Sequence, residues 1–146
     1  MSTQISEDSK NLADTLHSAA IHLLRKLRRE DAASGLNAPR LSALSVVVFA
    51  GPVTLGDLAG AEQVRPPTMT RIVDALAEQG LVVKKRNRED GRSTLIQATA
   101  AGKKLLMQGR ERRVRALAGQ IAALGEKDRA TLEKAAEILK GVIAAI

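Results

Sequence analysis

The segment from Leu55 to Gly102 constrains the fold of this chain more than any other. It contains two helix-forming patterns separated by a short turn, and then two apolar, β-branched runs that flank a charged loop. Helix, turn, helix and hairpin in this order form a winged helix-turn-helix. We therefore predict this motif as the centre of a mainly α fold with a small β-hairpin wing (α+β).

Local signals define the two helices of the motif. Thr54 and Asp57 form a capping-box arrangement, in which side chains satisfy free amides at a helix start, and they predict a short helix to about Ala61. Pro66 fits the first turn of a second helix, which Gly80 ends. One face of this second helix is apolar, at Met69, Ile72, Val73 and Leu76.

The start of the second helix is a candidate recognition site. Its amides and the positive end of its dipole favour phosphate, and Thr68, Thr70 and Arg71 face outward, where they could reach base edges in a major groove. Arg71 could hydrogen-bond a guanine. The alternative is a solvated helix face that only stabilises a three-helix core. The hairpin directly downstream favours nucleic-acid binding.

The loop of the hairpin carries five cations, Lys84, Lys85, Arg86, Arg88 and Arg92. Asp90 and Gly91 favour a tight turn, with Arg92 directly after it. Lysines can simply protect a hairpin edge against aggregation, but edge protection rarely needs five cations at one tip. We expect the first four cations to meet phosphates and Arg92 to enter a minor groove, with Asp90 orienting a neighbouring arginine by a salt bridge.

The charge distribution agrees with this interpretation. The net charge is +7, and residues 65–104 supply +5 of it, with nine Lys or Arg against four Asp or Glu. Residues 1–64 carry six against seven. Net charge alone does not distinguish a nucleic acid from an acidic protein or a membrane surface. Its concentration around the predicted helix start and wing favours nucleic acid.

Composition excludes several other classes. The chain has no cysteine, which excludes disulfides and thiolate metal sites, and its single aromatic residue provides no stacking platform for single strands. It has no run of eighteen apolar residues and no secretory signal pattern, so we expect a cytoplasmic protein without a membrane partner. Because no nucleophile-base, P-loop or dinucleotide pattern is present, we predict neither an enzyme nor a catalytic site, and no cofactor.

Amphipathic helices are predicted on both sides of the motif. Residues 8–31 and 100–146 repeat apolar side chains at three- and four-residue steps, with more apolar surface than a small monomer can bury. We interpret them as dimerisation helices around a DNA-binding lobe at residues 37–99, all within one domain over residues 1–146. The basic run Arg110–Arg115 is predicted to be a solvated helix face rather than a second DNA contact.

The two histidines do not form a metal site in this interpretation. His17 and His22 are five residues apart and lie more than about a hundred degrees apart around a helix axis. We expect one to be partly exposed and the other partly packed, with no metal bound.

The ordered motifs resemble those of the MarR (multiple antibiotic resistance regulator) family. The resemblance rests on residues 64–76, Glu78–Val82, Asp90–Arg92 and Thr99–Gly102, and it extends over nearly the whole chain. It implies a homodimer with interleaved first and last helices, which binds a pseudo-palindromic operator as a repressor and is released by a small ligand. The DNA contacts that it implies are Arg65, Pro66, Thr68, Thr70, Arg71 and Arg92.

The chain departs from the family pattern in two respects. Members commonly have arginine where the first strand leads into the wing, and Lys84-Lys85-Arg86 leaves open which residue takes that role. Oxidant-sensing members use cysteine, and zinc-sensing members use a richer His/Glu set than this chain has. Phenolic compounds are the remaining class of effector that the resemblance allows, and they would bind in a cleft between the dimer helices and the lobe. This cleft could be lined by His17, His22, Arg25 and Arg40.

Together these observations predict a sequence-specific regulator of transcription that binds double-stranded DNA as a homodimer, with repression as the expected mode. The alternative is a winged-helix protein-interaction module, whose basic wing docks on an acidic partner without specific DNA binding.

Overall fold

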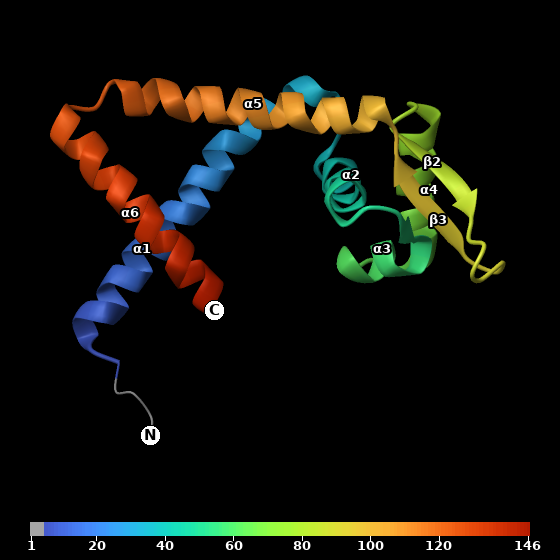
Figure 1. The fold of residues 1–146 in the computed structure, drawn as a ribbon, viewed down its shortest axis with the longest axis horizontal. Helices are drawn as coiled ribbons and strands as arrows, with labels where there is room; N and C mark the ends of the chain where they lie inside the picture. Colours follow the sequence, from blue (N-terminus) through green and yellow to red (C-terminus); the bar gives the residue numbers. More distant parts are fainter. Residues whose placement is uncertain (1–4) are drawn as a thin grey trace.

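The computed structural model describes residues 5–146, so residues 1–4 of the predicted domain lie outside the described part. The fold is mainly helical with one small sheet (Figure 1). In chain order the elements are α1 (Glu7–Leu27), the 3-10 helix η1 (Arg28–Ser34), α2 (Ala38–Ala50), β1 (Val53–Thr54), α3 (Leu55–Ala61), α4 (Pro66–Glu78), β2 (Val82–Arg86), β3 (Thr94–Ala98), α5 (Ala100–Ala122) and α6 (Glu126–Ala145).

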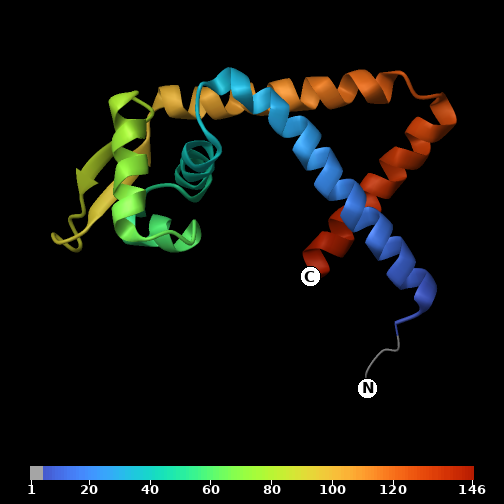
Figure 2. The same ribbon diagram turned by 180° about the vertical axis from the view of Figure 1, so that it is seen from behind.

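The elements divide into a lobe and two arms. The lobe consists of α2, α3, α4 and the sheet, and it lies at one end of the molecule (Figures 1 and 2). Helix α5 starts at the lobe and runs to the opposite end. The arms, α1 and α6, extend away from α5 on the side that the lobe also occupies (Figure 2).

Side-chain caps start α2 and α3. The Asn37 side chain accepts a hydrogen bond from the Arg40 amide (3.0 Å) at the start of α2. Thr54 Oγ1 accepts from the Asp57 amide (3.0 Å) at the start of α3. Each cap satisfies an amide that has no partner within its own helix. The start that the sequence predicts for the short helix after Thr54 is therefore confirmed.

The sheet has three antiparallel strands in the order β1-β3-β2, where the sequence predicted a hairpin of two. The predicted hairpin is confirmed, with β2 and β3 paired from Val82↔Ala98 to Arg86↔Thr94. Strand β1 adds the pair Val53↔Ile96 on the other side of β3. A strand of two residues is too short to show an alternating pattern, which is why the sequence did not reveal it.

The hydrophobic core lies within the lobe and is aliphatic. Leu44 of α2, Leu58 of α3, Met69 and Leu76 of α4 and Ile96 of β3 are all fully buried. These five side chains come from the three helices and the sheet, so packing among them fixes α4 against the wing. The apolar face predicted for α4 is the face that enters this core.

The first turn of α5 approaches the start of β2 unusually closely. The amide of Thr99 donates to the carbonyl oxygen of Leu81 (3.1 Å), and Thr99 Oγ1 donates to that of Gly80 (2.6 Å). Gly102 is buried at this contact, and a Cβ atom there would overlap the Leu81 carbonyl oxygen. Glycine is therefore required where α5 passes the base of the wing.

The arms have no buried residue in the single chain, in contrast to the lobe. This holds for every residue of α1 and α6. Their exposed large apolar side chains include Leu12, Leu16, Leu23, Leu24, Ile138, Val142 and Ile143. Within residues 5–146, no single helix is apolar and long enough to cross a membrane, although Glu7–Ser34 and Ala38–Ala50, bent by 90°, meet those criteria as a pair.

Candidate nucleic-acid interface

A tight turn between α3 and α4 sets the position of the helix start. The amide of Gln63 donates to Gly60 O (3.1 Å), and the amide of Val64 donates to Ala59 O (3.0 Å). Gln63 adopts a left-handed conformation (φ 55°), which is uncommon for a residue with a side chain. These contacts reverse the chain, so that Arg65 becomes the N-cap of α4.

The outward face of α4 carries the predicted contact residues. Arg65, Pro66, Thr68, Thr70 and Arg71 are all exposed at the start of this helix, and of these Arg71 lies most nearly opposite the buried face. Thr70 Oγ1 donates to Pro66 O (3.0 Å), which leaves the lone pairs of that hydroxyl free to accept. All five predicted residues are thus accessible to solvent at the start of one helix.

The predicted phosphate site at the amides of this helix start is wrong. Pro66 and Pro67 occupy the first helical turn, and neither has an N–H group. The next amide, that of Thr68, donates to Arg65 O (3.0 Å). A phosphate near the start of α4 would therefore have to meet the Arg65 side chain and the helix dipole rather than free amides.

The wing ends in a loop over residues 87–93, and a tight turn that begins at Asp90 lies within this loop rather than joining β2 directly to β3. Gly91 does not have the positive φ that a two-residue Asp-Gly hairpin turn requires. Asn87 instead closes the loop, through its amide to Ser93 O (3.1 Å) and its Nδ2 to Ser93 Oγ (2.9 Å). The Ser93 amide donates to Asp90 O (3.0 Å) and completes a second turn.

Asp90 orients Arg92 by a route other than the predicted salt bridge. Asp90 Oδ1 accepts the backbone amide of Arg92 (3.0 Å). Within residues 5–146 the Asp90 carboxylate makes no ion pair with a guanidinium. The bond fixes the backbone of Arg92 and leaves its exposed side chain without an ion-pair partner in the described chain.

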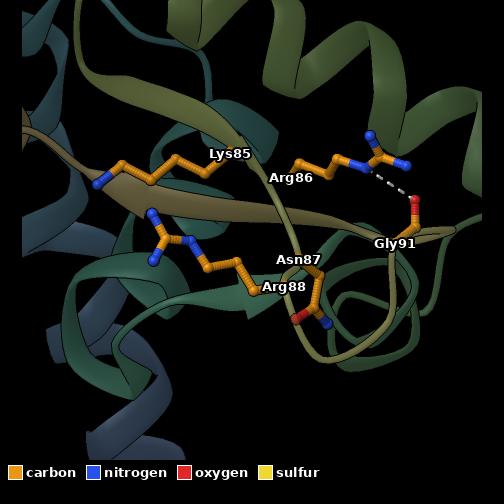
Figure 3. Close-up of a pocket in the computed structure, with 5 residues that line it drawn as sticks. All are labelled: Lys85, Arg86, Asn87, Arg88 and Gly91. Atoms are coloured by element: carbon orange, nitrogen blue, oxygen red, sulfur yellow. Dashed lines mark hydrogen bonds between the residues drawn. The ribbon is translucent and has the colours of Figure 1, made fainter.

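The other wing cations differ in what they contact. Lys85 and Arg88 extend in the same direction beside a shallow basic hollow, which Arg86, Asn87 and Gly91 also line (Figure 3). Arg86 points the opposite way, and its Nε donates to Gly91 O (3.3 Å).

Lys84 forms an ion pair that the sequence did not reveal. Its Nζ lies 2.5 Å from Asp74 Oδ1, and Asp74 belongs to α4. The sequence offered one signal, because Asp74 follows Thr70 by four residues and so lies on the same outward face. Nothing in the sequence indicated that this face and β2 meet.

The basic run of α5 is only partly the solvated face that the sequence predicted, because Arg110 and Arg115 are exposed whereas two other arginines contact η1. Arg113 Nη1 forms an ion pair with Asp31, and Arg112 Nε donates to Glu30 O (3.3 Å). Both arginines are half-buried, and Arg112 Nη2 is buried with no partner among the described residues. These two contacts connect α5 to η1, and each joins residues that are 82 positions apart along the chain.

The predicted effector residues line neither the hollow beside Lys85 and Arg88 nor the one along α5 at Lys104 and Arg115. His17, His22 and Arg25 are exposed on α1, and Arg40 is half-buried on α2. The expectation of one packed histidine is wrong for the single chain, because no other element covers α1 there. Residues 5–146 contain no group of three or more His, Asp or Glu side chains that could hold a metal ion.

Comparison with known proteins agrees with this geometry. The model of the MarR family matches residues 36–94. An HTH-type transcriptional regulator of Mycobacterium bovis is 34% identical over 137 residues, which cover 94% of this chain and 96% of that protein.

Two solved structures share the fold. A transcriptional regulator of Thermotoga maritima superposes with a TM-score of 0.84 at 20% identity, over 93% of this chain and 96% of that one. The MepR F27L mutant of S. aureus, solved bound to an oligodeoxyribonucleotide, superposes with a TM-score of 0.71 at 16% identity, over 92% and 98%. Because the relatives are regulators and not enzymes, and because they match along nearly the full length, this chain belongs to the MarR family of HTH-type transcriptional regulators.

Proposed function

We propose that this regulator binds a double-stranded, pseudo-palindromic operator, with the start of α4 in the major groove and the wing in the minor groove. The observation that carries the proposal is that the start of α4 and the wing tip lie at one end of the lobe, away from α5 (Figure 2). A duplex placed at that end meets both.

The side chains at this end suit different parts of DNA. Arg71 and the short side chains of Thr68 and Thr70 are exposed on α4, where they can reach base edges. Lys85 and Arg88 supply charge for phosphates. The exposed guanidinium of Arg92 suits a narrow minor groove, whose negative potential attracts cations. The S. aureus protein of the same fold, solved with an oligodeoxyribonucleotide, supports DNA as the partner.

We further propose that a second copy of the chain covers the arms. Val142 is 51% exposed, Ile143 69% and Leu12 62%, values that would leave a broad apolar surface in water. A homodimer formed through α1 and α6 buries this surface and places two lobes side by side. Each lobe then reads one half-site, with half-sites about one helical turn apart.

Repression follows if the operator overlaps a promoter, because a bound dimer blocks polymerase. Release by a small ligand in a cleft lined by His17, His22, Arg25 and Arg40 belongs to the same proposal. These residues lie on α1 and α2, so such a cleft depends on how the second copy packs.

Selection of bound duplexes from a random DNA pool tests the function directly. We expect enrichment of a two-fold symmetric site whose half-sites are about one helical turn apart. Binding should weaken by orders of magnitude between about 50 and 200 mM salt, because several phosphates are contacted. The proposal fails if no duplex is enriched, and capture of an acidic protein by the wing would then favour the interaction-module alternative.

A further inference from the structure

The side chains of β2 divide between two faces of the strand. Alternation places Val82, Lys84 and Arg86 on one face and Val83 and Lys85 on the other. Val82 is only 2% exposed, so the face that carries Val82, Lys84 and Arg86 is the inner face, which is turned toward the core. The inner face of β2 therefore carries two of the five wing cations.

The first inner cation joins the wing to the recognition helix. Lys84 Nζ lies 2.5 Å from Asp74 Oδ1, and the two side chains are 47% and 53% exposed. Asp74 follows Arg71 by three residues, so the pair lies about one turn beyond the proposed base contact on the same face of α4. The pair also neutralises a carboxylate that would otherwise repel the phosphates of a bound duplex.

The second inner cation holds the loop of the wing. Arg86 Nε donates to Gly91 O (3.3 Å), and the guanidinium lies against the Gly91 backbone, since a Cβ at that position would be 3.3 Å from Arg86 Nη2. Figure 3 shows Arg86 pointing away from Lys85 and Arg88. The Arg86 side chain thus bridges the loop, from the end of β2 to Gly91, the residue before Arg92.

We propose that Lys84 and Arg86 are positioning residues, which hold the wing at a fixed angle to α4, whereas Lys85, Arg88 and Arg92 meet the DNA. This inference rests on the proposed DNA binding and deepens it, because it assigns different roles to cations that are neighbours in sequence. A wing fixed in advance does not have to be ordered when DNA binds, so less conformational entropy is lost.

Salt dependence separates positioning from contact. The double variant Asp74→Asn/Lys84→Gln removes the ion pair without changing the net charge, and Lys85→Gln removes the adjacent cation of the outer face. Loss of one phosphate contact lowers the slope of log affinity against log salt by about one. We expect that loss for Lys85→Gln. For the double variant we expect an unchanged slope and about two- to fivefold weaker binding, the range for an exposed ion pair.

Two further outcomes bear on the assignment. The single variant Lys84→Arg keeps a cation opposite Asp74, so its affinity for DNA should equal that of the wild type. The inference is overturned if the double variant binds like the wild type, or if its slope falls as much as that of Lys85→Gln.

A measurement without DNA distinguishes failure of this inference from failure of the proposed function. Hydrogen exchange of the Asn87 and Ser93 amides reports on the order of the wing loop in the free protein. We expect faster exchange in the double variant and in Arg86→Gln, and unchanged exchange in Lys85→Gln. If those differences appear in a chain that binds no duplex, positioning stands and the proposed function fails. If exchange is unchanged in all variants, positioning fails whatever the DNA result.

Discussion

Replacing Gly102 with alanine should loosen the junction between α5 and the wing. The new Cβ would lie well within 3.0 Å of the Leu81 carbonyl oxygen, a distance that real Cβ atoms do not reach, and 3.2 Å from Leu44 Cδ1. The Leu81 carbonyl is backbone held by the Thr99 amide, so it cannot rotate aside as a flexible side chain would. Helix α5 must therefore shift away from β2.

The cost can be assembled from three contributions. Overpacking in a well-packed core costs about 1 to 3 kcal/mol, and weakening of the bond from Thr99 to Leu81 costs about 1 kcal/mol. Alanine recovers up to about 1 kcal/mol over glycine through its helix propensity. The free energy of unfolding should therefore fall by about 1 to 3 kcal/mol, which lowers Tm by about 3 to 10 °C for a domain of this size.

Thermal unfolding followed by circular dichroism at one protein concentration measures this change. Gly119→Ala is the matched control, because Gly119 lies in the same helix and a Cβ there has no neighbour within 4 Å in the described chain. That variant should melt at the wild-type temperature or slightly above it. If Gly102→Ala melts within about 1 °C of the wild type, the close approach of α5 to Leu81 does not constrain this position and the reasoning is refuted.

Four substitutions test the remaining assignments. Arg92→Ala should weaken operator binding in a mobility-shift assay while the dimer stays intact, and an unchanged shift would remove Arg92 from the interface. Arg71→Ala should reduce discrimination at one base pair by roughly 1 to 3 kcal/mol, measured by competition with single-base operator variants; uniform weakening over all sequences would argue against base reading. Arg113→Met should lower the free energy of unfolding in urea by roughly 1 to 3 kcal/mol, since its partner Asp31 is only 20% exposed; no change would mean that the link between α5 and η1 contributes little. Ile143→Asp should produce monomers in sedimentation experiments at micromolar concentration, and a stable dimer would exclude this face of α6 from the interface.

The helices and their ends could be predicted from the sequence because their causes are local. Asn37 and Thr54 cap amides three residues away, and Gly80 (φ 72°) ends α4 in the left-handed conformation that glycine adopts without strain. The outward position of Thr68 and Arg71 follows from helical spacing once Met69 and Val73 face the core. These contacts require only a few neighbouring residues, and any fold that contains the segment would show them.

A local pattern misleads where neighbouring groups prevent the bonding that the pattern suggests. The amides at the start of α4 were predicted to bind phosphate, yet the prolines that mark that start carry no N–H group. Asp90 and Gly91 read as a tight turn, but Asn87 and Ser93 close a longer loop around them. In both cases the pattern marks residues of the interface but does not reveal their hydrogen bonds.

By itself the sequence determined the order of the helices, the hairpin, the outward face of α4 and the basic character of the wing. Only the tertiary structure decided that β1 joins β3, that Lys84 pairs with Asp74, that Arg113 reaches Asp31 and that α5 passes Leu81 closely enough to require glycine. The physical reason is separation along the chain. Capping and periodicity act within one or two helical turns, whereas these contacts join residues from 10 to 82 positions apart, which come together only when the core of the lobe has packed.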